Sequence, residues 1–253
     1  MSIIIDIVSI SAINNDVDKL VELATRKCWQ SEFNSDINVR RKFVESKLKL
    51  GHESPLEHGS FTIEFSGVSR SWLAQETRHR TGSAYSIESQ RYVGYTLDNF
   101  QYVIPPKINN NKEALDIYNK FISEALSVYN KLRELPGIPK EDARFVLPNA
   151  ACTSGYMTKN FRQARHEINL RCSKGAQWEI HKFWAMILYG LWSLTSFMFD
   201  DLAIKFLPEE LLKKGKYSEN IQQLVGLVQN GHILRIKEVP ESQNEFGFIG
   251  QLL

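Results

Sequence analysis

The segment from Phe183 to Phe199 contains no charged residue, and it sets the strongest limit on what this chain can fold into. A helix that crosses a bilayer needs about 20 apolar residues. This segment is shorter, and it includes Gly190, Ser193 and Ser196. A stripe repeats along it at helical spacing: Trp178, Ala185, Trp192 and Phe199, with His181, Leu188 and Thr195 between them. We therefore predict a long helix in the core or in an oligomer interface, and no membrane span.

The charge balance excludes one class of partner. The chain has 253 residues, with 31 basic and 29 acidic side chains and a net charge of +2, which argues against a protein that coats duplex nucleic acid. No linker or low-complexity run divides it, so we expect a single domain over residues 1–253. The odd, widely spaced Cys28, Cys152 and Cys172 indicate reduced thiols. Asp6 interrupts the N-terminal apolar run, so we expect an initial strand and a cytoplasmic protein.

The other elements indicate an α+β fold. Helical spacing predicts a second long helix that ends at Pro136-Gly137. Its predicted inner stripe is Ala114, Ile117, Phe121, Ala125, Val128 and Leu132. Strands are predicted for the N-terminal run, Phe61–Phe65, Gln101–Ile104 and Ile233–Val239. They do not alternate with helices, and neither glycine-rich dinucleotide motif nor P-loop is present. We predict a small, mostly antiparallel sheet with several long helices.

A shorter predicted helix around Asn160 to Arg171 has two distinct faces. The inward stripe is Met157, Phe161, Ala164, Ile168 and Cys172. Arg162, His166 and Asn169 share a separate polar face. A solvated surface is the usual role of such a face, but Lys and Glu would serve that role as well. The mixture of Arg, His and Asn therefore favours ligand binding.

Residues 78 to 92 concentrate side chains that packing does not explain. Arg78, Arg80 and Arg91 each offer a planar fork of donors, and His79 adds an aromatic plane that can stack or donate. An anionic nucleotide is the ligand that this pattern favours. The structural alternative is a cationic helix C-terminus, with a helix that starts near Val68, continues through Arg78 and ends at Gly82.

This stretch resembles the signature of the flavin-dependent thymidylate synthases, in which Arg-His-Arg is followed at a short distance by Ser-x-Arg-Tyr. Two further blocks are similar to that family in order and spacing. Upstream, His52–His58 precedes the predicted strand Phe61–Phe65. Downstream the blocks are Asp142–Pro148, Asn160-Phe161-Arg162, His166, Asn169-Leu170-Arg171 and Ala176–Glu179. The resemblance covers residues from near 40 to near 200 and the close of the chain from Gly231 to Val239, whereas residues near 207–230 look like an insertion.

The resemblance implies an activity and its cofactors. Members of the family convert dUMP to dTMP, with methylenetetrahydrofolate as the one-carbon donor. FAD, reduced by NADPH, is the hydride donor, and no protein nucleophile takes part. The family also implies a homotetramer with active sites shared between subunits. No nucleic-acid or membrane partner is implied.

The resemblance also implies which residues form the site. Flavin and folate contacts are expected at His52, Ser54, Glu57, Arg78, His79, Arg80, Glu88, Asn160, Arg162, His166 and Asn169. Contacts with dUMP are expected at Gln75, Glu76, Thr77, Arg78, Ile87, Glu88, Ser89, Gln90, Arg91, Arg144 and Arg171. Arg171 is the implied catalytic residue, because a guanidinium beside the N3 edge of the uracil pushes electron density towards C5.

The chain departs from the common family pattern in one place, the loop between Arg80 and Ser89. Eight residues separate Arg80 from Ser89 where many members have seven, so Ile87 stands at a position that is often acidic and Glu88 follows it. His166 stands where some members carry Asn. Cys28 resembles a small residue near the flavin, although we expect a buried structural cysteine there.

Other functions compete with this interpretation. A single-stranded nucleic-acid-binding module would use a basic and aromatic surface made of Arg78, His79, Arg80, Arg91, Tyr92 and Tyr95. A cysteine-dependent thymidylate synthase would need a thiolate beside a base, and no cysteine has such a His neighbour in sequence. A metal at His52, Glu53, Glu57 and His58 is disfavoured because Pro55 interrupts the helix and the histidines are six residues apart.

Overall fold

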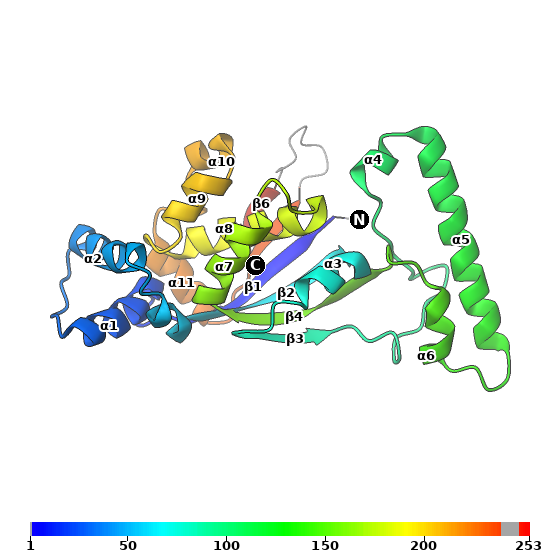
Figure 1. The fold of residues 1–253 in the computed structure, drawn as a ribbon, viewed down its shortest axis with the longest axis horizontal. Coiled ribbons are helices and arrows are strands. Elements are labelled where there is room, and N and C mark those ends of the chain that lie inside the picture. The colour runs from blue at the N-terminus through cyan, green and yellow to red at the C-terminus, as the bar shows by residue number, and fades with distance from the viewer. Residues whose placement is uncertain (1, 239–247) are drawn as a thin grey trace. The chain divides into compact units, whose positions relative to one another are not determined.

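The computed structural model describes residues 2–238 and 248–253, and its elements confirm the predicted α+β fold (Figure 1). The strands are β1 Ile4–Ile10, β2 Ser60–Ser69, β3 Ser83–Ile87, β4 Cys152–Asn160, β5 Leu234–Glu238 and β6 Phe248–Leu252. The first helices are α1 Val17–Trp29, α2 Ile37–Lys49, the 3-10 helix η1 Ser54–His58, α3 Arg70–Glu76, α4 Pro106–Asn109, α5 Lys112–Glu134, α6 Lys140–Ala143 and the 3-10 helix η2 Arg144–Val146. The later helices are α7 Phe161–Arg171, α8 Trp178–Leu194, α9 Asp200–Phe206, α10 Glu209–Lys214 and α11 Ile221–Gln229.

The strands form one sheet in the order β3-β4-β2-β1-β5-β6. The pairs β1–β5 and β5–β6 are antiparallel, with Asp6 opposite Arg235 in the first pair. Three predicted strands are confirmed as β1, β2 and β5, while Val239 at the end of the last prediction lies outside the described residues. The predicted strand Gln101–Ile104 is wrong. Only Tyr102 forms an isolated bridge, with Ala151, and two prolines follow directly.

Sequence patterns did not predict β3, which has two serines in five residues, or β4, which contains Thr, Ser and Gly, because neither shows a clear apolar alternation. Gly155 of β4 shows why a glycine is needed there. A Cβ at this position would lie 2.4 Å from the backbone oxygen of Ser86 in β3. The close approach of the two backbones therefore excludes a side chain.

The chain divides into two compact units, and each is described separately. Unit 1 comprises residues 66–77 and 86–155, and the described part of unit 2 comprises residues 2–65, 78–85, 156–238 and 248–253. The prediction of a single domain over the whole chain stays a prediction.

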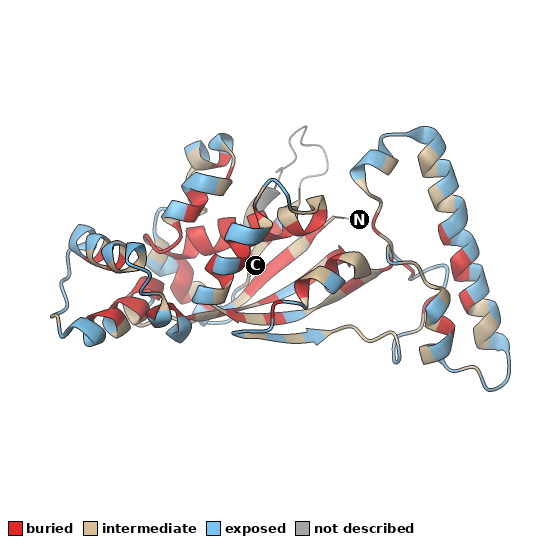
Figure 2. Ribbon diagram, viewed as in Figure 1, coloured by how far each residue is buried: buried red, intermediate tan, exposed pale blue. Residues whose placement is uncertain are grey.

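Helix α8 forms the core of unit 2, as the uncharged segment predicted (Figure 2). From Phe183 to Leu194 every residue is buried, and α8 packs against β1 and β5. Gly190 allows this packing, because a Cβ there would lie 2.5 Å from the Ile7 side chain. The helix ends at Leu194, so the last members of the predicted stripe lie in the following loop. Among the described residues no helix is both long and apolar enough to cross a membrane.

The segment near 207–230 contains α10 and α11 and belongs to unit 2. Helix α11 packs against β1 and α8 and buries Leu224, Val225 and Val228. This segment therefore contributes to the core of the unit.

Helix α5 is the longest helix of unit 1, and its predicted inner stripe is confirmed at Ala125 but wrong at Ile117, Phe121 and Val128, which are exposed. Ile117 and Phe121 are 66% and 55% exposed. The other buried residues are Ile122, Leu126 and Tyr129, which pack with Tyr95, Phe100, Ala143 and Ala151. Two apolar stripes overlap on this helix at similar spacing. The structure buries the one that meets the aromatic rings of Tyr95 and Phe100.

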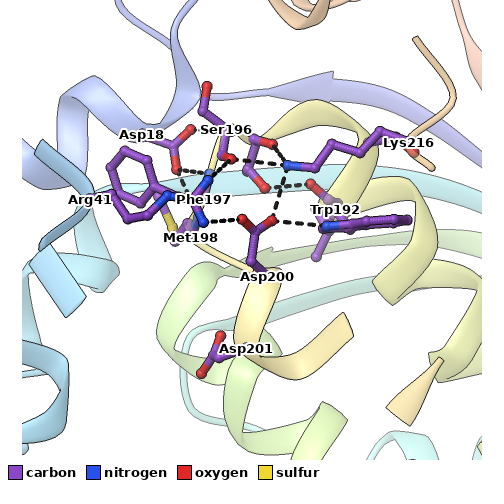
Figure 3. Close-up of polar contacts among 12 residues, drawn as sticks. Asp18, Arg41, Trp192, Ser196, Phe197, Met198, Asp200, Asp201 and Lys216 are labelled. Carbon is purple, nitrogen blue, oxygen red and sulfur yellow. Dashed lines mark hydrogen bonds and ion pairs between the residues drawn. The ribbon is translucent and has the colours of Figure 1, made fainter. Parts of the chain in front are cut away.

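A buried carboxylate in unit 2 holds the loop that follows α8 (Figure 3). Asp18 of α1 accepts hydrogen bonds from the backbone N–H groups of Ser196, Phe197 and Met198, at 2.6, 3.4 and 2.9 Å. Burial raises the pKa of Asp18 to about 6, and the three backbone hydrogen bonds oppose that shift.

A second carboxylate, Asp200, lies beside this loop (Figure 3). It accepts from Trp192 Nε1 and forms ion pairs with Arg41 and Lys216. Together Asp18 and Asp200 connect α1, α2, α8 and the 207–230 segment.

Candidate functional site

The basic segment Arg78-His79-Arg80 is not part of a helix. Helix α3 begins after Ser69, whose Oγ accepts from Trp72 N–H, and it ends at Glu76, so the predicted helix from Val68 to Gly82 is wrong. Val68 belongs to β2, where its side chain is buried. Because the cations lie beyond the helix terminus, the explanation by helix dipole does not account for them.

The three residues of this segment have different environments. The side chains of Arg78 and Arg80 are exposed, and within residues 2–238 and 248–253 neither forms an ion pair or hydrogen bond. His79 between them is only 9% exposed. The two guanidiniums can therefore meet an anionic ligand, whereas the His79 ring is directed into unit 2.

The buried ring of His79 contacts the predicted catalytic residue. Arg171 Nε donates to His79 Nε2 over 3.0 Å, so this nitrogen carries no hydrogen and the ring is neutral in this arrangement. The ring also lies 6.3 Å from that of His166, edge to face. Arg171 is the last residue of α7 and is half-buried. The structure thus brings together three predicted site residues, His79, His166 and Arg171.

The predicted polar face of α7 is exposed, as expected. Arg162, His166 and Asn169 all lie on the surface, opposite the buried Phe161, Ala164 and Ile168. Met157 of the predicted stripe is buried, but it lies in β4 and not in the helix. Asn160 ends β4 and caps the helix, because its Oδ1 accepts from Gln163 N–H at 2.8 Å.

The upstream block contacts the same helix. His52, Ser54 and Glu57 are exposed on and just before η1, and Arg162 forms ion pairs with Glu57 and Glu53. The hydrogen bond that Arg162 donates to Glu57 raises the pKa of Arg162. His52 packs edge to face on Trp29, with ring centroids 5.4 Å apart. Asn169 accepts from Lys205 Nζ at 2.9 Å.

Sequence analysis missed the residues behind His79. Lys159 of β4 is fully buried and forms an ion pair of 2.6 Å with Glu167 of α7, which is also fully buried. The second Glu167 oxygen lies 3.8 Å from His79 Nε2. The spacing of four between Gln163, Glu167 and Arg171 places them on one helix face. That spacing could have indicated that Glu167 lies near Arg171, but the same spacing is equally typical of an ion pair on a helix surface.

In unit 1 the acidic residue after β3 has a defined position. Glu88 accepts from Tyr95 Oη at 2.6 Å and from Ser154 Oγ at 3.2 Å. Burial, followed by the contact with Glu88, raises the pKa of Tyr95 to about 12. Glu88 also lines a cavity of about 150 Å³ together with Ser66, Gly67, Asn99, Gln101, Cys152 and Thr153. Ile87 ends β3 and is half-buried.

The other predicted dUMP residues of unit 1 differ in exposure. Glu76 is fully buried, whereas Gln75, Thr77, Ser89 and Gln90 are half-buried. The burial of Glu76 removes its side chain from contact with a surface ligand within this unit.

Two predicted dUMP arginines meet at an acidic residue that sequence analysis missed. Arg91 Nε lies 2.6 Å from Glu141 Oε2, and Arg144 Nε donates to the backbone oxygen of Glu141 at 3.1 Å. Lys140 Nζ donates to the backbone oxygen of Tyr92 at 2.8 Å. Three cationic side chains therefore lie around the first turn of α6. Glu141 directly precedes the family-like block that begins at Asp142, and this position was the sequence signal that could have identified it.

The cysteines and aromatic residues bear on the competing functions. Cys28 is exposed, so the prediction of a buried structural cysteine is wrong. Cys172 is buried, and burial raises its pKa to about 12, which makes it a poor nucleophile. Because Tyr95 and His79 are buried, neither can stack on a single-stranded base. In the described part of the chain, no three His, Cys, Asp or Glu residues are grouped so that they could hold a metal ion.

The donor set of unit 2 fits a flavin nucleotide. Exposed guanidiniums at Arg78 and Arg80 suit a pyrophosphate, and the exposed His166 and Asn169 offer donors and acceptors for a heterocycle. Arg162 fits less well on its own, because Glu53 and Glu57 already balance its charge.

Comparison with known proteins agrees with this chemistry. Residues 9–193 match the model of the family described as thymidylate synthase complementing protein. The chain is 38% identical over 171 residues to a flavin-dependent thymidylate synthase of Geobacter sulfurreducens, a match that covers 65% of this chain and 73% of that protein. It is 33% identical over 206 residues to the enzyme of the same name from Mycobacteroides abscessus, covering 75% of this chain and 81% of that protein. The chain therefore belongs to the thymidylate synthase complementing protein family and is a flavin-dependent enzyme of the thymidylate synthase type.

Proposed function

We propose that this chain converts dUMP to dTMP, with methylenetetrahydrofolate as the one-carbon donor, NADPH as the reductant and FAD as the cofactor. The observation that carries the proposal is the half-buried guanidinium of Arg171, which is held by His79 at the end of α7. The same helix exposes His166 and Asn169, and the exposed cations Arg78 and Arg80, which have no partner in the described part of the chain, flank His79 in sequence. The family and its named relatives support the reaction class.

Within unit 2, the exposed residues described above would hold the FAD. Arg78 and Arg80 would bind its pyrophosphate through charge-assisted hydrogen bonds. His166 and Asn169, with Asn160, Arg162, His52, Ser54 and Glu57, would contact the rings and the folate side. Bound flavin supplies the hydride chemistry. The buried His79 ring contributes by orienting Arg171, and its backbone remains the part that can reach the cofactor.

In unit 1, the cluster around α6 supports phosphate binding. Arg91 and Arg144 approach Glu141 from its side chain and its backbone. We propose that the dUMP phosphate takes the place of the Glu141 carboxylate as the partner of Arg91. The 87–90 loop supplies the other proposed dUMP contacts of this unit, with Glu88 held in its place by Tyr95 and Ser154.

Arg171 polarises the uracil in this proposal. A guanidinium beside the N3 and carbonyl edge stabilises negative charge there and raises electron density at C5, where the new carbon bond forms. Loss of one preorganised donor of this kind costs about 3 kcal/mol in other enzymes. The charge of Arg171 is fixed in place before substrate binds, because His79 already holds its Nε.

We further propose that the protein is a homotetramer with sites shared between subunits and that it has no nucleic-acid ligand. Family membership supports this assembly.

Spectroscopy and product analysis test the proposed function together. The purified protein should be yellow, bind FAD without a covalent bond, and form dTMP from dUMP, methylenetetrahydrofolate and NADPH. A colourless protein that also fails to bind added FAD would refute the proposal. Formation of dTMP without any flavin would refute it equally.

A further inference from the structure

A buried ion pair in unit 2 has no role in the proposed chemistry as stated so far. The side chains of Lys159 and Glu167 are both fully buried, and their charged groups lie 2.6 Å apart. Ser83 Oγ and Tyr85 Oη accept further hydrogen bonds from Lys159 Nζ, at 3.2 and 2.8 Å. Desolvating two charges costs several kcal/mol, and apolar residues of similar size are often equally stable or more so. Stability alone therefore does not account for this pair.

The pair connects to the predicted catalytic arginine. Glu167 Oε1 accepts from Lys159 and from Gln163, while Oε2 lies 3.8 Å from His79 Nε2. That same His79 nitrogen accepts from Arg171 Nε at 3.0 Å. Because this nitrogen carries no hydrogen, the approach of Glu167 Oε2 is a contact and not a hydrogen bond, and Glu167 borders the His79–Arg171 pair without holding it directly.

A second contact fixes the backbone of His79. Tyr85, in β3, donates its hydroxyl hydrogen to the His79 backbone oxygen at 2.9 Å and accepts from Lys159 at the same oxygen atom. Lys159 is therefore linked to the His79 backbone through Tyr85, while Glu167 holds the Lys159 ammonium in place. One buried ammonium group thus fixes the residue that holds Arg171.

We propose that the Lys159–Glu167 ion pair is a positioning unit for the uracil-activating arginine, acting on Arg171 through His79. This inference rests on the proposed function, because it assigns Arg171 to the uracil. The carboxylate of Glu167 fixes the Lys159 ammonium, and Lys159 holds the Tyr85 hydroxyl that binds the His79 backbone, so the pair keeps His79 where its Nε2 meets Arg171. Without the pair, His79 can shift, and the guanidinium loses its fixed acceptor. Catalysis by a preorganised charge is sensitive to displacements of about 1 Å.

The main test removes both charges at once. Lys159→Met/Glu167→Leu keeps the size of both side chains and leaves no unpaired buried charge, so we expect a folded protein. At saturating dUMP, turnover per bound flavin should fall at least about tenfold, while the KM for dUMP and the flavin content stay within about threefold of the parent. A matched control is Asp6→Leu/Arg235→Met, which removes a bidentate ion pair between β1 and β5 of the same unit. Its turnover should stay within about twofold of the parent.

A second variant covers failure of the first to fold. Tyr85→Phe keeps the Lys159–Glu167 pair and removes only the hydroxyl that connects it to the His79 backbone. We again expect reduced turnover with an unchanged KM for dUMP. Calorimetric titration with dUMP should give the parental Kd, a result that general damage to the unit would not produce.

The outcomes separate the two proposals. Parental turnover per flavin in these variants would overturn the positioning inference while leaving the proposed function intact. A loss of activity that merely follows loss of flavin would also overturn it. A parent protein that makes no dTMP would remove the proposed function and the inference with it.

Discussion

Asp18 should make the stability of this protein depend on pH between about 4 and 6. Its carboxylate is fully buried, and burial raises its pKa from 3.8 to about 6 despite three backbone hydrogen bonds. Because the folded-state pKa lies above the unfolded value, the group contributes its full stabilisation below about pH 4 and loses it as the pH rises past 6. Two pKa units correspond to about 3 kcal/mol in total. About 2 kcal/mol of this falls between pH 4.5 and 7.

The substitution Asp18→Asn removes the titration but keeps one acceptor oxygen. The amide group can still accept from Phe197 and Met198, but it loses the bond from Ser196 N–H, at a cost of about 1 to 3 kcal/mol that does not depend on pH. Relative to the parent, the variant should therefore gain about 2 kcal/mol of unfolding free energy as the pH rises from 4.5 to 7. Urea unfolding at four or more pH values measures this difference.

A control variant lies in the same loop. Thr195→Val removes the hydrogen bond from Thr195 Oγ1 to the backbone oxygen of Leu191 without removing a titrating group. It should lower the unfolding free energy by the same amount at every pH. If the difference between Asp18→Asn and the parent stays constant within about 0.5 kcal/mol over this range, burial does not control the pKa of Asp18 and the reasoning is refuted.

Two further predictions concern the chemistry. Arg171→Ala should retain flavin and oxidise NADPH slowly, while dTMP formation falls about 100-fold. Arg91→Ala should chiefly raise the KM for dUMP, because a phosphate anchor contributes uniform binding energy. Steady-state kinetics with product analysis distinguishes the two variants, and dTMP formation at the parental rate by Arg171→Ala would contradict the role of Arg171. A triple variant in which Ala or Ser replaces Cys28, Cys152 and Cys172 should keep a turnover per flavin close to that of the parent. Replacement of the buried Cys172 should lower the unfolding free energy by about 1 kcal/mol. Loss of turnover in a folded, flavin-loaded triple variant would show that a cysteine takes part in the reaction.

Sequence patterns were informative wherever apolar spacing had a single solution. Helix α8 and the exposed polar face of α7 follow directly from it. On α5 two stripes were available, and the chain alone could not show that Tyr95 and Phe100 would cover the one containing Ile122 and Leu126. Strand β4 escaped detection because its contact with β3 depends on the absence of a side chain at Gly155. A contact that depends on a single glycine produces no periodic pattern of apolar residues in the sequence.

The Lys159–Glu167 pair shows a different limit of sequence patterns. In sequence, the visible neighbour of Glu167 is Arg171, four residues later, and helix surfaces carry many ion pairs at this spacing that add little stability. The free-energy cost of the Lys159–Glu167 pair depends on its burial, which here comes from the packing of α7 against α8. A lysine at the end of a polar strand gives no warning that its ammonium group will meet a carboxylate behind a histidine. The residues that bind ligand are therefore easier to predict from sequence than the residues that hold them in place.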